Sequence, residues 1–229
     1  MSKKNILIIE DELDLASMIK NYLVKEQYNA EIISNGGEAV AAVERYQPQM
    51  ILLDLMLPGK DGLEILRQIR LKSTIPVIII SAKETELDRI LGLKIGADDY
   101  MTKPFSIKEL IARVDALFRR VDNYRFTTEA NGKLNYGNIS IDFASRTVKK
   151  NDEMINLTPK EFELLILLTE HPRQVLSKEQ IYDNVWGLNE YGDINTVTIH
   201  IQKIREKLGQ EHGITTVRGI GYRFDGGLK

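Results

Sequence analysis

The sequence predicts an α/β protein built from two domains, and three observations carry this prediction. The chain has 229 residues, which exceeds the size at which one hydrophobic core usually gives way to two. Its first half alternates short apolar runs with segments of helical period, a pattern typical of a parallel sheet flanked by helices. Its second half instead combines short alternating runs with strong helix-start signals. We therefore expect a second, smaller domain of mixed structure.

Five short runs in the first half are predicted strands. They cover residues 6–9, 30–33, 50–53, 77–80 and 100–102. Three of them are apolar throughout, so they should be central strands covered on both faces. Helices are expected between them, near residues 13–26, 36–46, 62–71, 85–95 and 106–119. The first domain is thus a five-fold βα repeat over residues 1–121.

Residues 122–132 are polar, lack periodicity and end in a glycine, which indicates a linker. The second domain then covers residues 133–229. Short strands are expected at 134–136, 139–141, 147–149 and 155–157. Thr158 is followed by proline and, three positions later, by Glu161, which predicts a helix start. That helix should end at His171, before Pro172. Ser177 and Gln180 form a second capping box, a third helix is expected over 195–208, and strands over 214–217 and 222–224 close the chain.

Composition excludes several classes of protein. The chain has no cysteine, which excludes disulfides and thiolate metal sites. Its longest apolar runs are too short to cross a bilayer, and residues 1–4 lead directly into a strand rather than a signal sequence. We therefore expect a cytoplasmic protein with no membrane partner. Acidic and basic residues are nearly balanced in both halves, so any binding of nucleic acid must depend on a local patch.

Polar residues follow four predicted strands of the first domain at the edge where ligands bind in open parallel sheets. Glu10 and Asp11 follow the first strand, and Asp54, Ser81 and Lys103 end the third, fourth and fifth. Any one such acidic residue alone is more often a solvated loop residue. Converging carboxylates without thiolates or paired histidines suit a hard cation, and Mg²⁺ is the natural choice beside a phosphoryl group.

This combination predicts a phosphoacceptor site. A carboxylate can attack a phosphoryl group when a metal neutralises the charge on the transferred oxygens. Asp54 is the predicted nucleophile, and Glu10 and Asp11 are predicted to hold the metal directly or through water. Lys103 is expected to pair with the phosphoryl oxygens, and the Ser81 hydroxyl to hydrogen-bond to one of them.

The helix predicted at 195–208 carries an apolar stripe for the domain core, formed by residues 197, 201, 204 and 208. The rest of the helix should point outward, with hydrogen-bonding side chains and cations that suit a DNA major groove. Ile199 lies off the stripe, where it is either a contact to a thymine methyl or an ordinary surface isoleucine. Arg218 lies in the closing hairpin, either in a wing that enters a minor groove or in a surface turn.

Residues 1–121 resemble the receiver domain of bacterial two-component response regulators. The matching segments are IIEDE at 8–12, LDLMLPG at 53–59, ISA at 80–82 and GADDYMTKPF at 96–105. The resemblance implies a flavodoxin-like fold, phosphoryl uptake from a sensor histidine kinase, and metal contacts from Asp54 and the Met56 carbonyl. It also implies a switch pair, Ser81 and Tyr100, although Tyr100 also fits a half-buried aromatic residue on an edge strand.

The resemblance is to the subgroup that dimerises through one receiver face when phosphorylated. The predicted cross-subunit ion pairs are Arg89 with Glu109, and Asp98 or Asp99 with Arg113. Exposed pairs of this kind contribute only about 0–1 kcal/mol each, which suits a dimer that must be reversible.

Residues 133–229 resemble the winged-helix effector domain of the OmpR/PhoB subgroup. The match lies in LTPKEF at 157–162, VW at 185–186, TVTIHI at 196–201 and VRGIGY at 217–222. By analogy, residues on the third helix face bases, others meet phosphates, and the loop 187–193 touches RNA polymerase. Asn195 and Gln202 depart from the subgroup, where arginine is common. The predicted DNA-binding residues are Trp186, Thr196, Thr198, Ile199, His200, Lys203, Arg205 and Arg218.

The leading hypothesis is a transcription factor in which phosphorylation of Asp54 favours dimers that bind promoter DNA. The main rival is a phosphatase of the haloacid dehalogenase class, which needs a second aspartate two residues after its nucleophile. Met56 stands at that position, so we expect no enzyme beyond slow self-dephosphorylation. A regulator that binds DNA without phosphorylation is disfavoured, because the predicted pocket is complete.

Overall fold

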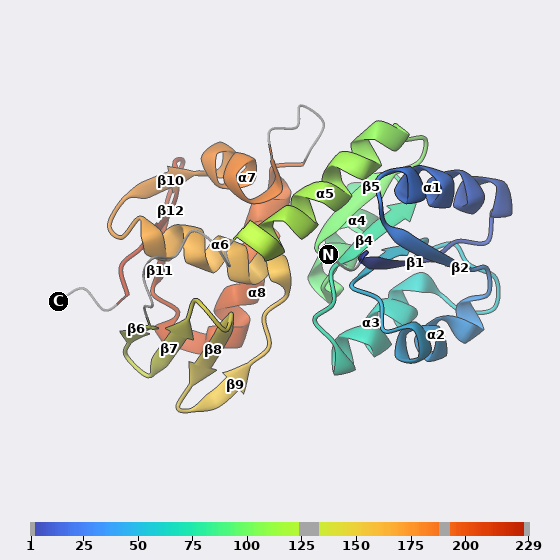
Figure 1. The fold of residues 1–229 in the computed structure, drawn as a ribbon. Helices are drawn as coiled ribbons and strands as arrows, with labels where there is room; N and C mark the ends of the chain where they lie inside the picture. Colours follow the sequence, from blue (N-terminus) through green and yellow to red (C-terminus); the bar gives the residue numbers. More distant parts are fainter. Residues whose placement is uncertain (1–2, 124–132, 188–192, 227–229) are drawn as a thin grey trace. The chain divides into compact units, whose positions relative to one another are not determined.

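The computed structural model describes residues 3–123, 133–187 and 193–226. The chain forms two compact units, Met1–Val114 and Asp115–Lys229. Figure 1 shows the parallel sheet and its helices in the first unit, and the helices and small sheets of the second. The predicted linker lies almost wholly outside the described residues, since helix α5 (Ile107–Asn123) extends two residues past residue 121.

The first unit contains one parallel sheet of five strands in the order β2-β1-β3-β4-β5. This order is that of the flavodoxin-like doubly wound folds, as the resemblance implied. The strands are β1 (Asn5–Ile9), β2 (Asn29–Ile33), β3 (Met50–Leu53), β4 (Val77–Ser81) and β5 (Asp99–Thr102). In Figure 1, helix α1 (Leu13–Lys25) lies on one face of the sheet, while α2 (Ala39–Tyr46) and α3 (Gly62–Lys72) lie on the other.

Burial follows the sequence pattern in this sheet. Every residue of β3 and β4 is buried, and β1 is buried from Ile6 onward. Helices on both faces leave no polar side of the sheet, so these strands need continuous apolar runs. Strand β2 lies at the sheet edge and leaves Asn29 and Glu31 exposed. The prediction of apolar central strands is confirmed.

The start of α3 fixes the backbone beside Asp54. The Asp61 side chain caps α3 by accepting a hydrogen bond of 2.9 Å from the Leu63 amide. A Cβ on Gly62 would lie 2.5 Å from the Asp54 carbonyl oxygen and 2.5 Å from the Leu55 Cα. Only glycine therefore allows α3 to begin this close to the end of β3.

The second unit begins with a four-stranded antiparallel sheet in the order β6-β7-β8-β9. These strands are β6 (Lys133–Tyr136), β7 (Ile139–Asp142), β8 (Thr147–Lys150) and β9 (Glu153–Ile155). Three helices follow: α6 (Pro159–Glu170), α7 (Lys178–Trp186) and α8 (Asn195–Leu208). A three-stranded sheet, β10-β12-β11, completes the unit, with β10 (Val175–Ser177), β11 (Ile214–Val217) and β12 (Gly221–Phe224).

The helix starts of this unit follow their sequence signals, whereas two strands do not. Both capping boxes are present, at Thr158 with Glu161 and at Ser177 with Gln180. The strand predicted at 155–157 is wrong, because β9 pairs with β8 through Glu153–Ile155. Strand β10 was not predicted. It has only three residues, and its pairing with β12 depends on a partner more than forty residues away in the chain.

Candidate phosphoacceptor site and nucleic-acid interface

The carboxyl edge of the first sheet brings together the predicted phosphoacceptor and its partners. Asp54 directly follows β3, Glu10 follows β1 and Lys103 follows β5. The Lys103 Nζ lies 2.6 Å from Asp54 Oδ2 and 2.8 Å from Glu10 Oε2. The Met56 amide donates a hydrogen bond of 2.9 Å to Asp54 Oδ1. Each oxygen of the Asp54 carboxylate is therefore held by a different donor.

Burial shapes the electrostatics of this pocket. Asp54 and Glu10 are only 3% and 2% exposed. Loss of hydration raises the pKa of Glu10 to about 7, against the lowering effect of its hydrogen bond with Lys103. Burial alone would lower the pKa of Lys103, but its bonds to Asp54 and Glu10 raise it overall. The lysine is thus kept as a cation between two carboxyl groups.

The same edge offers oxygen ligands for a cation. Ligand oxygens of Glu10, Asp11 and Asp54 all lie within 4.8 Å of one another. Asp11 is exposed, while the other two are buried. Three carboxylates that converge from two strand ends form a donor set suited to a hard divalent ion. This acidic cluster can bind a metal, as the sequence predicted, whereas the predicted contact from the Met56 carbonyl stays a prediction.

The two predicted switch residues are connected through one backbone position. Ser81 ends β4 and is fully buried, and its Oγ accepts a hydrogen bond of 3.3 Å from the Lys83 amide. The Tyr100 hydroxyl donates a hydrogen bond of 2.9 Å to the Lys83 carbonyl. Burial raises the pKa of Tyr100. Sequence reasoning missed Lys83, because it acts through its backbone and its side chain gives no signal.

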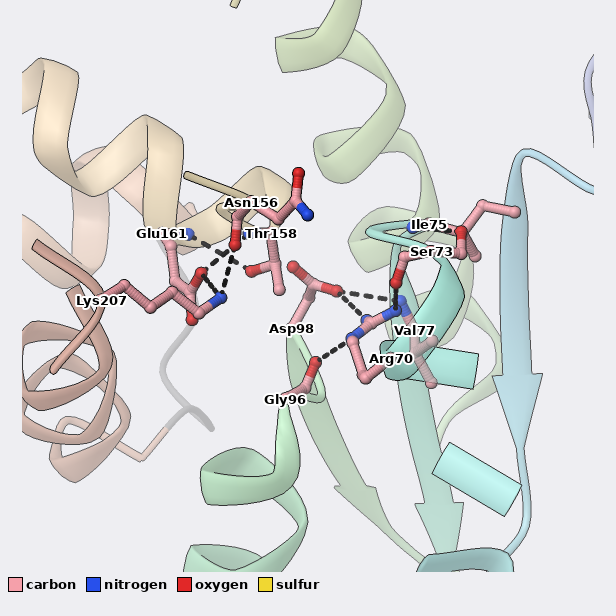
Figure 2. Close-up of polar contacts among 10 residues, drawn as sticks. All are labelled: Arg70, Ser73, Ile75, Val77, Gly96, Asp98, Asn156, Thr158, Glu161 and Lys207. Atoms are coloured by element: carbon pink, nitrogen blue, oxygen red, sulfur yellow. Dashed lines mark hydrogen bonds and ion pairs between the residues drawn. The ribbon is translucent and has the colours of Figure 1, made fainter. Parts of the chain in front are cut away.

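One residue predicted for the dimer face has a different place. Asp98 is fully buried and accepts hydrogen bonds of 3.0 Å from Arg70 Nη2 and from the Val77 amide. Arg70 Nε also donates to the Gly96 carbonyl at 2.7 Å (Figure 2). Within the chain, the Asp98 carboxylate therefore joins α3 to the segment before β5, and its predicted pair across a dimer stays a prediction.

Three other residues predicted for the dimer face form ion pairs with one another within the chain. Arg113 of α5 lies 2.6 Å from Asp99 and 2.7 Å from Glu109. Asp99 and Arg113 are both buried, at 6% exposure each. Arg89 lies on α4 (Glu86–Ile95) and is partly exposed. Pairs of these residues between two chains stay a prediction.

Helix α8 buries more of its surface than the apolar stripe predicted. Three residues expected to point outward are buried at 3–6% exposure, namely Thr196, Ile199 and His200. The His200 Nδ1 donates to the Thr196 carbonyl at 3.0 Å, and its ring packs edge-on against Trp186 with centroids 5.0 Å apart. Helix α8 packs against both α6 and α7, which requires a buried surface wider than one stripe.

Trp186 is likewise buried, and its ring stacks on Tyr182 with centroids 5.4 Å apart. The outward positions expected for Thr196, Ile199 and His200 are therefore wrong, and Trp186, which is predicted to bind DNA, is buried as well. Their contacts with DNA stay predictions that require these side chains to become accessible.

The remaining predicted DNA-binding residues are accessible. Thr198 is exposed, and its Oγ1 accepts a hydrogen bond of 3.3 Å from the Tyr222 hydroxyl. Arg205 Nη2 donates to the Ile214 carbonyl at 3.1 Å and to Thr216 Oγ1 at 2.8 Å, which ties α8 to β11. Lys203 pairs with Glu206 at 3.4 Å. Arg218 is exposed in the turn between β11 and β12, which is the position predicted for a wing.

A further contact holds α8 in place and was missed from the sequence. Lys207 Nζ lies 2.5 Å from Glu161 Oε2 and donates to the Asn156 carbonyl at 2.8 Å (Figure 2). The same Glu161 oxygen accepts from the Thr158 amide at 2.8 Å, within the capping box. The capping signal was visible, but the lysine that joins it lies forty-six residues away.

Comparisons with known proteins agree with both halves of this description. Residues 6–115 match the family model described as response regulator receiver domain, and residues 151–224 match transcriptional regulatory protein, C terminal. The chain is 39% identical to the sensory transduction protein RegX3 of Mycolicibacterium smegmatis, over 97% of this chain and 99% of the relative. It is 38% identical to the DNA-binding response regulator MtrA of Mycolicibacterium paratuberculosis, over 96% and 98%.

Solved structures show the same relationship. A RitR mutant matches with a TM-score of 0.77 and 30% identity, over 97% of this chain and 99% of that one. The receiver domain of the Francisella response regulator 1452 matches with a TM-score of 0.51 and 36% identity, over 52% of this chain and 100% of that one.

The fold and the acidic pocket define a receiver, and the unit that follows defines a transcriptional regulator. The chain belongs to the OmpR/PhoB subfamily of two-component response regulators. Within its described residues, no helix is both long and apolar enough to cross a membrane.

Proposed function

We propose that this regulator takes a phosphoryl group from a sensor histidine kinase onto Asp54, and that this change controls how its C-terminal domain binds promoter DNA. The observation that carries the proposal is the contact of Lys103 with Asp54 Oδ2 and with Glu10 at the ligand-binding edge of the sheet. A cation held at a buried carboxylate is already placed to bind the oxygens of a phosphoryl group attached there.

The proposed reaction is a phosphoryl transfer. An Asp54 oxygen forms a bond to phosphorus while the phosphorus–nitrogen bond to the kinase histidine breaks, and the electron pair of that bond returns to the imidazole. Lys103 then moves its hydrogen bond from the carboxylate to a phosphoryl oxygen. Glu10, Asp11, Asp54 and the Met56 carbonyl would hold Mg²⁺, which would supply positive charge for the phosphoryl oxygens.

The backbone at Lys83 provides a route from the phosphoryl group to the surface. In the proposal, Ser81 Oγ turns to hydrogen-bond to a phosphoryl oxygen and gives up the Lys83 amide, which lies 3.3 Å away. The shift of this segment also removes the carbonyl that holds the Tyr100 hydroxyl. Tyr100 then rotates inward, which changes the surface of α4, β5 and α5.

The changed surface is proposed to form a homodimer that places two effector domains on DNA. Arg89 with Glu109, and Asp99 with Arg113, are the candidate pairs between chains. Doubling the DNA contacts raises the apparent affinity without any new contact. Contact with RNA polymerase is assigned to loop 187–193, of which residues 188–192 lie outside the described part of the chain. Because promoter DNA is the proposed partner, the proposal places the protein in the cytoplasm.

The proposal does not include turnover as an enzyme. Met56 occupies the position where a haloacid dehalogenase phosphatase has its second aspartate, and its amide is used to hold Asp54 Oδ1. We propose slow self-dephosphorylation at most. Turnover of a generic phosphate ester would support the rival.

The test combines phosphorylation with oligomeric state. The full chain is treated with acetyl phosphate and Mg²⁺, then examined by phosphate-affinity electrophoresis and by size-exclusion chromatography with light scattering. We expect a phosphorylated band and a larger dimer fraction for the wild type, and neither for Asp54→Ala. Asp61→Ala, which removes the aspartate that caps α3 and leaves Asp54 in place, is the matched control and should still accept phosphate. An unchanged dimer fraction in the wild type would refute the proposed switch.

A further inference from the structure

The exposed face of α8 carries two amide side chains and a hydroxyl that can hydrogen-bond to base edges. Asn195, Thr198 and Gln202 are exposed, and Glu206 continues the same stripe one turn later. Spacings of three and four residues place all of them on one side of the helix. Opposite this stripe, the residues that α8 buries are those already described as its packing surface. The stripe is therefore the part of α8 that is open to a DNA groove.

The cations of α8 are engaged elsewhere. The Arg205 guanidinium bonds to the Ile214 carbonyl and to Thr216 on β11. Lys207 is held by Glu161 and the Asn156 carbonyl. Lys203 is paired with Glu206 on its own helix. Guanine is read in the major groove most often by an arginine or lysine that contacts O6 and N7. On this helix, all three cations already have partners in the protein.

The amides are suited to a different base. Asparagine and glutamine pair with adenine through two hydrogen bonds, in which the amide oxygen accepts from N6 and the amide nitrogen donates to N7. The Gln202 Nε2 donates one hydrogen bond to Glu206 Oε1 at 2.9 Å. This bond fixes the orientation of the amide, and it leaves the second Nε2 hydrogen and the oxygen available. Glu206 thus orients the Gln202 amide so that both groups that could pair with adenine are available.

Thr198 completes the stripe with a directed hydroxyl. Its Oγ1 accepts from the Tyr222 hydroxyl, so its own hydrogen is free to donate toward an acceptor in the groove. A threonine pairs with several bases and gives no strong preference. Discrimination on this face therefore falls to Asn195 and Gln202.

From this arrangement we propose that Asn195 and Gln202 are specificity-determining residues, and that each half-site of the operator carries adenine at the two positions that they contact. This inference rests on the proposed DNA-binding function. The two residues are seven positions apart, about 10 Å along the helix, which corresponds to about three base-pair steps for a helix lying along the groove.

The test begins with the acetyl phosphate-treated full chain and a library of random DNA duplexes, from which retained sequences are read. We expect two enriched adenine positions in each half-site. Asn195→Ala should remove one preference and Gln202→Ala the other. In fluorescence anisotropy titrations, changing the adenine assigned to Gln202 into guanine should weaken wild-type binding about 5- to 150-fold and should affect Gln202→Ala far less. Gln210→Ala, an exposed glutamine beyond the end of α8, should behave like the wild type.

Two further measurements separate readout from a merely structural effect. Replacement of the assigned adenine by 7-deazaadenine removes the N7 acceptor, and this should weaken binding by the wild type but not by Gln202→Ala. Gln202→Arg should change the preferred base at that position from adenine to guanine. If duplexes are retained but the adenine preference persists in both alanine variants, this inference is overturned and the proposed DNA-binding function stands. Retention of no duplex would overturn the proposed DNA-binding function and this inference with it.

Discussion

Loss of the Asp98 carboxylate should be among the most damaging changes to the first unit. The side chain is fully buried and satisfies both Arg70 and the Val77 amide. In Asp98→Ala, the guanidinium of Arg70, whose side chain is 10% exposed, loses its anion, and the amide loses its acceptor. Removal of one partner of a buried ion pair costs about 3–5 kcal/mol. With a urea slope of about 2 kcal/mol/M, the unfolding midpoint should fall by about 2 M.

Hydrogen exchange read by mass spectrometry across a urea series is the suitable assay, because peptides from β4 and β5 report this unit separately from the other. The matched control is Lys72→Ala, also on α3, which breaks a 2.7 Å pair between Lys72 and Glu44 of α2. Both of its side chains are more than half exposed, so a loss of at most about 1 kcal/mol is expected. Equal midpoints for Asp98→Ala and Lys72→Ala would refute the reasoning.

Three further predictions concern stability and the phosphoacceptor site. Lys207→Met removes both contacts to Glu161 and the Asn156 carbonyl and should destabilise the second unit by about 1–3 kcal/mol, measured by the urea dependence of Trp186 fluorescence. Gly62→Ala forces a Cβ against the Asp54 backbone and should cost about 1–3 kcal/mol, with slower uptake of phosphate from acetyl phosphate. Burial, and then the charge of Arg205, lower the pKa of His212 below its usual 6.5, so stability present above pH 6.5 should be lost as pH falls through the lower folded-state pKa. The urea midpoints measured at pH 7.5 and at pH 5.5 should therefore differ less in His212→Gln than in the wild type.

Each of these has a matched comparison. Lys203→Met removes a lysine of the same helix with a weaker partner, and a loss as large as that of Lys207→Met would contradict the assigned contacts. Gly37→Ala meets only the side-chain oxygen of Asn35 at 3.1 Å, and its phosphate uptake should match the wild type. A wild-type midpoint that rises on acidification relative to His212→Gln would contradict the sign given for His212.

The sequence predicted most of the first unit because its signals are local. Continuous apolar runs identified the buried strands, and their ends identified Asp54, Glu10 and Lys103 as neighbours, because parallel strands share one carboxyl edge. Capping boxes at Thr158 and Ser177 likewise predicted where α6 and α7 begin. In these cases a signal in neighbouring residues identifies the element, and the rule that parallel strands share one carboxyl edge brings the strand ends together.

Predictions failed where a partner lies far away in the chain. The charge of Asp98 suggested a surface residue, yet Arg70 lies twenty-eight positions earlier and allows its burial. Ile199 and His200 were assigned to the outside by helical period alone, which cannot report how many neighbours a helix has. Lys83 makes its contacts through its backbone amide and carbonyl, so its residue type gives no sign of them in the sequence. Long-range pairing and backbone contacts are therefore the parts that required the structure.

The lysine held between two carboxylates also determines the total charge of the phosphoacceptor pocket. The formal charges of Glu10, Asp11, Asp54 and Lys103 sum to about −2, which a divalent cation would neutralise. Conversion of the Asp54 carboxylate into an acyl phosphate then adds roughly one negative charge. So small a change in net charge cannot act over a long range at physiological salt, where the Debye length is about 8 Å. Phosphorylation must therefore change the rest of the protein through direct hydrogen bonds to the new oxygens. Ser81 is placed to make the first of these bonds, because its hydroxyl already contacts the backbone at Lys83.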